Sequence, residues 1–187
     1  MPEEYDYDLV VVGGGPAGSS AAFAAAKNGI KVALIEKENS IAETVRTSGV
    51  TWIESIKEFG IPDNCYNPIK NFSFVSPNNE VTISDSIATA AVLDVRKTYR
   101  WLANEAEETG ADIFLKININ EVIKNENNDI VGVKGTGPKG EIIFHSKIVI
   151  DATGFTSVIS KAMGFVTQWK RFGAGAEYEA IVENSDP

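Results

Sequence analysis

The sequence is poor in the side chains that most often carry catalysis. Among its 187 residues there is one cysteine, Cys65, and one histidine, His145. A single cysteine excludes an internal disulfide and favours a reducing compartment. No group of histidine, cysteine and acidic residues has the spacing of metal ligands, and no Gly-x-Ser-x-Gly elbow occurs. The sequence therefore predicts neither a metal site nor a serine hydrolase, and it favours a surface role for His145.

Long apolar runs and basic stretches are missing as well. No apolar segment is long enough to span a bilayer, and the stretch from Met1 to Asp8 is acidic, unlike a signal peptide. The formal net charge is -9 with no basic stripe to offset it, which argues against nucleic acid as the main partner. These features predict a cytoplasmic protein and leave a peripheral membrane contact open.

The most informative stretch is a glycine-rich turn between two apolar runs. The run LVVV leads into Gly13, Gly15 and Gly18 at GxGxxG spacing, and the next run, VALI, ends at Glu36. Gly13 allows the tight turn, Gly15 lets a pyrophosphate approach the backbone, and Gly18 lets the helix pack on the sheet. Glu36 is placed to accept hydrogen bonds from a ribose diol and disfavours the 2′-phosphate of NADP. The order strand, turn, helix, strand, acid predicts binding of the adenosine half of FAD or NAD.

Three neighbouring residues belong to the same predicted site. Pro16 and Ala17 open the helix whose N-terminal N–H groups would face the phosphates, and Lys37 follows the acid.

Periodicity and turn signals place the other elements. Predicted helices cover 17–27, 50–59, 95–109 (with Asp94 as N-cap) and 158–163. Predicted strands cover 72–75, 81–83, 90–95, 112–115 (buried), 147–150 and 175–182, and hairpin turns fall at 125–129 and 137–140. Trp52 and Trp101 lie on predicted helix faces and are expected to pack in the core or between domains. The basic and aromatic stretch 169–172 is expected to be a crossover loop.

Three further motifs follow the glycine turn along the chain. They are Arg46-Thr-Ser-Gly49, Arg96 at the head of the predicted helix 95–109, and Asp151-Ala-Thr-Gly154 after an apolar run. In this order the motifs resemble the two-domain FAD-dependent oxidoreductases typified by aromatic hydroxylases and geranylgeranyl reductases. The similarity is greatest to the archaeal geranylgeranyl reductase branch.

The resemblance implies an α/β fold. A Rossmann-like, FAD-binding parallel sheet with a crossover helix and a small antiparallel β layer is expected, followed by the start of a mixed β substrate domain. The FAD-binding domain would comprise residues 1–70 and 93–165. Residues 71–92 and 170–187 would supply strands of a partial substrate domain, as in the N-terminal portion of a longer flavoprotein.

The resemblance also assigns the first of the later motifs to the cofactor. Arg46, Thr47 and Gly49 would lie along the ribityl and pyrophosphate part of FAD, where a guanidinium is a bidentate phosphate donor. Arg96 would reach the cofactor from the start of its helix. The alternatives are a solvated loop arginine for Arg46 and a surface helix charge for Arg96.

The remaining implied contacts lie farther along the chain. The backbone of Ile119, or of Asn120, would pair with the adenine edge. Asp151 and Gly154 would support the pyrophosphate side of the sheet, although Asp151 is equally suited to cap the helix that follows.

The function implied is that of a FAD-dependent oxidoreductase of geranylgeranyl reductase type, which reduces isoprenoid carbon–carbon double bonds with reduced flavin. The expected partners are a small-molecule or lipid substrate and a reductant or electron-donor protein. A FAD-dependent monooxygenase or halogenase is one alternative, and a non-catalytic nucleotide-binding portion is another. No side chain is singled out as the proton donor.

Three departures from the family pattern bear on this choice. Thr153 stands before Gly154 where NADPH-dependent hydroxylases usually carry Asp-Gly, which weakens the hydroxylase alternative. The loop after the second strand lacks the cysteine that many archaeal geranylgeranyl reductases carry there. The third flavin motif, a Gly-Asp pair before a helix, does not occur in the sequence.

Overall fold

A six-stranded mixed sheet forms the body of the molecule. The computed structural model describes residues 2–165, and its largest sheet has the order β8-β2-β1-β11-β10-β9. Strands β8, β2, β1 and β11 are parallel neighbours, whereas β10 and β9 continue the sheet antiparallel. The strands are β1 (Glu3–Val12), β2 (Val32–Ile35), β8 (Asp112–Phe114), β9 (Asn118–Lys124), β10 (Ile130–Gly137) and β11 (Gly140–Asp151). The predicted α/β fold and both predicted hairpin turns are confirmed.

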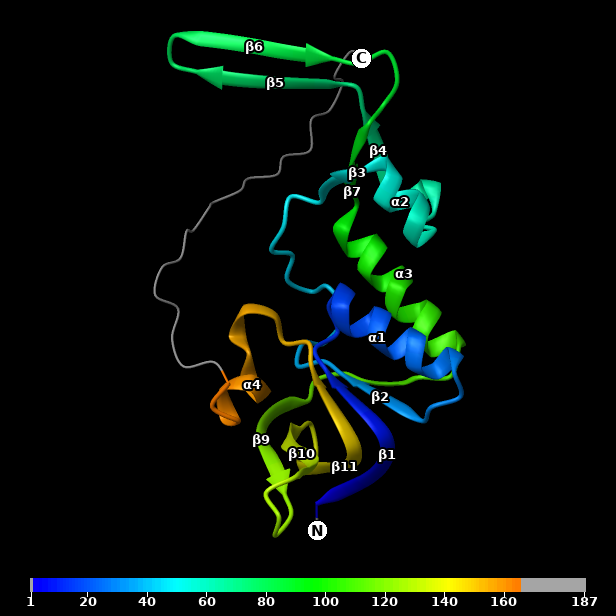
Figure 1. The fold of residues 1–187 in the computed structure, drawn as a ribbon, viewed down its shortest axis with the longest axis vertical. Helices are drawn as coiled ribbons and strands as arrows, with labels where there is room; N and C mark the ends of the chain where they lie inside the picture. Colours follow the sequence, from blue (N-terminus) through cyan, green and yellow to red (C-terminus); the bar gives the residue numbers. More distant parts are fainter. Residues whose placement is uncertain (1, 166–187) are drawn as a thin grey trace.

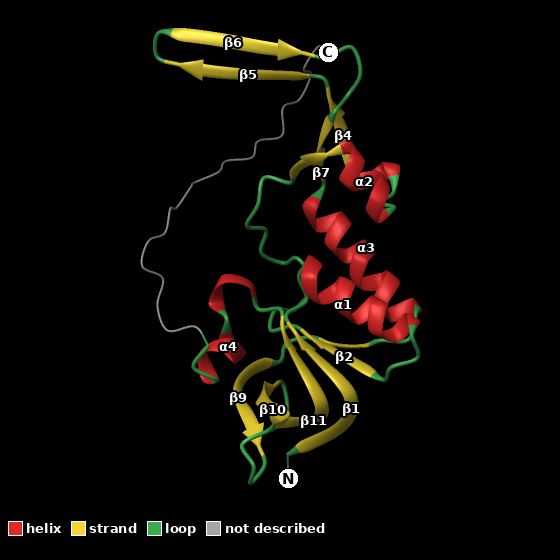
Figure 2. Cartoon of the chain, in the orientation of Figure 1, coloured by secondary structure: helices red, strands yellow, loops and turns green. Residues whose placement is uncertain are grey.

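Helices cover both faces of this sheet (Figures 1 and 2). Helices α1 (Pro16–Lys27) and α3 (Val95–Glu108) pack together over one face, and α4 (Val158–Ala162) lies against β9 on the other. Two short 3-10 turns complete the helical elements, η1 (Asp63–Cys65) and η2 (Gly154–Thr156). The chain between β2 and β8 therefore passes through α3, which brings a second helix beside α1.

The carboxyl half of β1 is buried on both faces, as its continuous apolar sequence predicts. Leu9 and Val11 pack under α1 and α3, where Ala22 lets the helix approach closely. Val10 and Val12 face the other side, where they join a core that includes Phe144. Burial of each such side chain contributes roughly 1.5–3 kcal/mol, so this strand is a rigid base for the turn that follows it.

A smaller antiparallel layer continues from the far end of α3. Its sheet has the order β3-β7-β4, and α2 (Ile53–Phe59) follows β3 directly. The three strands are β3 (Val50–Trp52), β4 (Tyr66–Ile69) and β7 (Ala90–Leu93). Hairpin β5 (Asn71–Ser76) and β6 (Asn79–Ser84) projects beyond this layer (Figure 1). The predicted hairpin is thereby confirmed.

One face of the β5–β6 hairpin is apolar. The register places Phe72 opposite Ile83 and Phe74 opposite Val81, so these four side chains share a face. Phe74 keeps 62% of its surface exposed, and Val81 keeps 59%. Among the described residues, this is an apolar surface without a packing partner.

Two element predictions were wrong in part. The predicted helix 50–59 is split, because residues 50–52 pair with β7 as strand β3 and the helix begins only at Ile53. Trp52 consequently lies on an edge strand and is 64% exposed rather than in the core. Strand β8 is likewise an edge strand with Asp112 exposed, so the predicted buried strand 112–115 is short and open to solvent on one side. The predicted strand 175–182 and the loop 169–172 lie outside the described residues.

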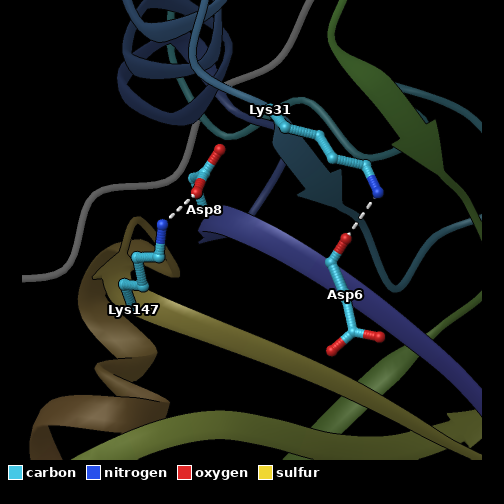
Figure 3. A network of polar contacts seen from close by, with 4 residues as sticks. All are labelled: Asp6, Asp8, Lys31 and Lys147. Atoms are coloured by element: carbon cyan, nitrogen blue, oxygen red, sulfur yellow. Dashed lines mark hydrogen bonds and ion pairs between the residues drawn. The ribbon is translucent and has the colours of Figure 1, made fainter.

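Polar contacts connect residues 4–8 of β1 to neighbouring segments, and two of these contacts are drawn in Figure 3. Lys147 Nζ on β11 lies 2.7 Å from Asp8 Oδ1, and Lys31 Nζ donates to the Asp6 carbonyl at 2.7 Å. His145 Nε2 lies 3.3 Å from Glu4 Oε2, with much of the imidazole exposed. Solvent-exposed pairs of this kind add little to stability because water and salt screen them. In the part of the chain that the structure describes, no helix is both long and apolar enough to cross a membrane.

Candidate functional site

A cavity of ≈ 430 Å³ opens where the parallel strands end. The carboxyl ends of β1, β2 and β11 meet there with the N-terminus of α1, the loop after β2 and the loop after β11. Open α/β sheets bind ligands at this edge. The predicted site residues that line it are Gly13, Gly15, Pro16, Ala17, Glu36, Lys37, Arg46, Ile119 and Gly154.

Gly13, Gly15 and Gly18 of the turn have different structural roles. Gly13 has a φ of 111°, and a Cβ there would lie 2.3 Å from the Ala152 carbonyl oxygen. A Cβ on Gly18 would lie 1.8 Å from the Gly13 carbonyl oxygen, so helix α1 can sit this close to the turn only without a side chain. Gly15 has ordinary φ, and nothing lies within 4 Å of its Cβ position. Gly13 and Gly18 are therefore needed by the fold, and Gly15 leaves open space on the cavity side.

The N-terminus of α1 points at this open space without a capping side chain. Gly15 is the N-cap residue, Pro16 occupies the first turn, and no acidic residue lies in that turn. The first N–H groups of a helix have no partner within the helix and carry a partial positive charge. Pro16 removes one donor and fixes the backbone, while the remaining N–H groups are oriented as in anion-binding helix termini.

Glu36 ties the end of β2 to the glycine turn. Its Oε2 accepts a hydrogen bond from Gly14 N at 2.7 Å, and its Oε1 accepts one from Glu38 N at 2.9 Å. Each carboxylate oxygen keeps a further lone pair. The carboxylate therefore orders two backbone segments of the cavity wall and still presents acceptor capacity toward the cavity.

The loop after β2 reaches across the cavity to the loop after β11. The Arg46 guanidinium lies over the Phe155 ring with 5.6 Å between Cζ and the ring centroid. Thr47 and Gly49, which were predicted to join Arg46, do not line the cavity. Gly49 is buried instead, and a Cβ there would lie 2.7 Å from Val95 Cγ2.

Arg96 acts on the loop wall rather than on the cavity itself. Its Nε donates to the Ala42 carbonyl at 3.1 Å, and its Nη2 donates to the Glu43 carbonyl at 3.3 Å. One turn later, Arg100 Nε donates to the Ile41 carbonyl at 3.3 Å. Helix α3 thus donates side-chain hydrogen bonds to three successive carbonyls of the loop after β2. Ala42 in that loop lines the cavity.

Asp151 holds the turn after β11. Its carboxylate accepts hydrogen bonds from the backbone N and hydroxyl of Thr153 and from the backbone N and hydroxyl of Ser160. Burial opposes ionisation of this carboxyl, but the four donors outweigh it, so the pKa of Asp151 lies below its ordinary value. Asp151 thus accepts from a backbone N–H in the first turn of α4, whose N-cap residue is Ser157, and Gly154, with a φ of 64°, lies on the cavity wall.

Several lining residues were not singled out from the sequence. Gly14 lies between predicted residues, and a Cβ there would meet Ile41 and Glu36. Phe155 directly follows a predicted motif, so its sequence position could have drawn attention to it. Tyr99 comes from the inner face of α3, and burial raises the pKa of its hydroxyl. The other lining residues outside the predicted set are Val12, Ile35, Glu38, Ala42, Thr44, Ile117, Asn118, Ala152, Thr153, Thr156 and Val158.

Comparison with known proteins decides the family. A family model described as FAD dependent oxidoreductase matches residues 8–174. The chain belongs to the FAD-dependent oxidoreductase family. Its expected cofactor, FAD, is thereby confirmed at the level of the family.

Relatives of this flavoprotein include a protein named as a phospholipid reductase. It is 36% identical over 179 residues to the digeranylgeranylglycerophospholipid reductase of Methanocaldococcus jannaschii, covering 92% of this chain and 45% of the reductase. It is 31% identical over 177 residues to an uncharacterized protein in the nifH2 5′ region of Methanosarcina barkeri, covering 88% of this chain and 91% of that protein. This flavoprotein thus spans less than half the length of the reductase. The resemblance to geranylgeranyl reductases that the motifs indicate is confirmed.

A solved structure agrees with this result. The geranylgeranyl bacteriochlorophyll reductase-like protein of Thermoplasma acidophilum superposes with a TM-score of 0.77 at 31% identity. The superposition covers 86% of this chain and 42% of that one. The fold of this chain therefore has a counterpart in a solved structure.

The residues at the cavity fit the adenosine and pyrophosphate part of FAD. Three features meet at this cavity. Gly15 has no side chain to block a ligand, the N-terminus of α1 is uncapped and can bind an anion, and the Glu36 carboxylate can bind a ribose diol. Arg46 adds a cation to the lining of the same cavity.

Proposed function

We propose that this chain binds FAD in the cavity at the ends of β1, β2 and β11. The adenosine ribose would lie at Glu36, with Lys37 beside it, and the pyrophosphate would lie over Gly15 at the N-terminus of α1. Pro16 and Ala17 would shape that terminus. Ile119, whose side chain is buried, would present its backbone toward the adenine.

The observation that carries this proposal is the open space at Gly15. Among the described glycines without positive φ, it is the only one whose Cβ position has nothing within 4 Å. The fold therefore does not itself require a glycine there, whereas a ligand that touches the backbone does. A glycine at a position where no contact among residues 2–165 needs one supports close approach by a phosphate.

The remaining predicted contacts form the rest of the proposed site. Arg46 and Gly154 would flank the pyrophosphate and ribityl chain from two loops. Thr47, Gly49, Arg96 and Asp151 would act by holding those loops in place, because none of the four lines the cavity.

We infer a reductase of the geranylgeranyl type for the protein's chemistry. When bound and reduced, FAD supplies a hydride for one carbon of an isoprenoid double bond, and a proton goes to the other carbon. The names of the archaeal relatives support a lipid substrate, and such a substrate would be met at a membrane surface by a cytoplasmic protein. A reductant or electron-donor protein would reduce the oxidised flavin again after each turnover. This chain's own residues would bind the cofactor, orient it and exclude water from its adenosine end.

Cofactor binding is tested by titrating the purified chain with FAD. We expect saturable binding with a flavin absorption band, and at least about a hundredfold weaker binding for Gly15→Val, since backbone approach is lost. Ala24→Val on the exposed side of α1 is the matched control and should bind FAD like the wild type. Binding by Gly15→Val at wild-type affinity would refute this placement of the pyrophosphate.

The reaction is tested with the FAD-loaded protein, dithionite as reductant and digeranylgeranylglycerophospholipid as substrate. Mass spectrometry should show two added hydrogens for each double bond reduced, without oxygen. Product that appears only with oxygen and carries new oxygen or halogen would instead support a monooxygenase or halogenase.

A second candidate is a FAD-binding portion without turnover of its own. It is favoured by the share of the reductase that this chain spans, 45%, and by the missing Gly-Asp motif. Tight FAD binding with no change in substrate mass under anaerobic reduction would support it.

A further inference from the structure

A second cavity, which we call the basic cavity, lies beside the first turns of α3. Its volume is ≈ 540 Å³. Three cationic side chains line it together with a tryptophan and two amides: Arg96, Lys97, Arg100, Trp101, Asn64 and Asn104. None of these residues lines the cavity at the glycine turn.

Within residues 2–165, the three cations have no carboxylate ion-pair partner. Among the ion pairs of the described residues, none involves Arg96, Lys97 or Arg100. Their contacts are to neutral carbonyls instead, as where Lys97 Nζ donates to the Asn64 carbonyl at 2.8 Å. The one acidic residue in the lining, Asp94, accepts from Lys97 N as the cap of α3. In a chain of net charge -9, three cations beside a single carboxylate form a local excess of positive charge.

The place of these cations along α3 adds to the effect. Arg96 and Lys97 lie in the first turn of a 14-residue helix, and that turn has no acidic residue. The helix dipole is positive at this end, where the Asp94 carboxylate caps the helix, and it disfavours the cations that lie there and favours a further anion. An anion in the basic cavity would relieve both the mutual repulsion and the unfavourable dipole interaction.

The donors suit a phosphate group. Arg100 uses only Nε for the Ile41 carbonyl, which leaves its terminal N–H groups available, and Lys97 keeps two further N–H groups. Guanidinium and ammonium groups together are the usual partners of phosphate oxygens. We propose that the basic cavity binds the phosphate group of a second ligand, separate from the site at the glycine turn. That group belongs either to a soluble phosphate ester or to a phospholipid headgroup.

Inorganic pyrophosphate is the probe for the shared chemistry. Isothermal titration of the protein at low salt, with saturating FAD present, should show saturable binding that weakens as salt is added. Lys97→Gln and Asn104→Asp should each weaken it by at least about tenfold, the first by losing a cation and the second by repulsion. Lys97→Arg should restore binding, and Lys57→Gln on α2 is the control of equal charge change.

The same variants separate this proposal from the one for FAD. Lys97→Gln should keep wild-type FAD binding and an unchanged thermal unfolding midpoint. An effect of Lys97→Gln on pyrophosphate assigns the anion to the basic cavity whether or not FAD binds. Equal weakening in Lys57→Gln, or no saturable binding by the wild type, would overturn the proposal.

Two further arms identify the source of the phosphate. GDP serves as a soluble ester without adenine, and vesicles containing phosphatidic acid are compared with vesicles of phosphatidylcholine alone. Binding of GDP that Lys97→Gln weakens indicates a soluble ligand. Lys97-dependent binding to the phosphatidic acid vesicles alone indicates a headgroup.

Discussion

The Arg46 guanidinium stacks over the Phe155 ring at 5.6 Å and joins two loops across the mouth of the proposed FAD cavity. One loop follows β2 and the other follows β11, so the contact links segments more than a hundred residues apart in sequence. Both side chains are exposed, and an exposed cation–π contact contributes about 0.5–1 kcal/mol. Its main effect is to set where the Arg46 charge lies over the cavity.

We therefore expect Phe155→Leu to weaken FAD binding by about two- to fivefold through misplacement of Arg46. Arg46→Gln should weaken it by about tenfold or more, because a charged donor to phosphate is lost. Flavin fluorescence titration measures both effects. Phe74→Leu changes an equally exposed phenylalanine on the distant hairpin and should leave FAD binding unaltered. If Phe155→Leu and Phe74→Leu behave alike, the stacking has no role in binding.

Gly18 offers a test in which two physical effects have opposite signs. Alanine favours a helix interior by about 1 kcal/mol over glycine, so propensity alone predicts that Gly18→Ala stabilises the protein. The new Cβ would lie 1.8 Å from the Gly13 carbonyl oxygen, however, and the helix would have to move off the turn. We expect a net loss of about 1–3 kcal/mol in unfolding free energy, measured by urea denaturation. Gly15→Ala, which meets no atom, should change it by less than about 1 kcal/mol, and a rise in stability for Gly18→Ala would contradict the packing argument.

Glu36 should control how the site treats a 2′-phosphate. Its carboxylate would repel that group by about 1 kcal/mol or more at contact distance. Wild-type protein should therefore bind 5′-AMP better than adenosine 2′,5′-bisphosphate, and Glu36→Gln should reduce this preference by about fivefold. Displacement of bound FAD by the two nucleotides measures the ratio. Because a ratio is compared, any general loosening of the turn by Glu36→Gln cancels, and an unchanged ratio would place the ribose elsewhere.

The glycine turn could be predicted from sequence because its determinants are local. Its parts follow one another within a few dozen residues: a strand, a turn that needs Gly13, a helix that needs Gly18, and an acid at the end of the next strand. Their places in the cavity follow from the βαβ unit itself. The open space at Gly15 is the structural counterpart of its predicted role, although binding itself remains a prediction.

The later motifs could not be oriented from sequence. Whether Arg96 points at a ligand or at the carbonyls of Ala42 and Glu43 depends on where the loop after β2 passes α3, a tertiary relationship. The exposure of Trp52 also depends on a tertiary relationship. The sequence of residues 50–59 suits a helix, but residues 50–52 pair with β7 and form an edge strand instead. Phe155 directly follows the motif that ends at Gly154, but its contact with Arg46 on another loop could not be predicted from that position.

Asp151 makes the stability of the turn after β11 dependent on pH. Its folded-state pKa lies below the ordinary value, so its stabilising contribution is present above the ordinary aspartate pKa and is lost as pH falls through the folded pKa. We expect the unfolding free energy of the wild type to fall more steeply between about pH 5 and pH 2 than that of Asp151→Asn. At neutral pH the variant should already be about 1–3 kcal/mol less stable, because it can accept fewer of the four hydrogen bonds from Thr153 and Ser160. Urea denaturation at several pH values measures the difference, with Asp85→Asn as a control on the exposed hairpin side. Parallel pH profiles for the wild type and Asp151→Asn would show that this carboxylate does not hold the turn.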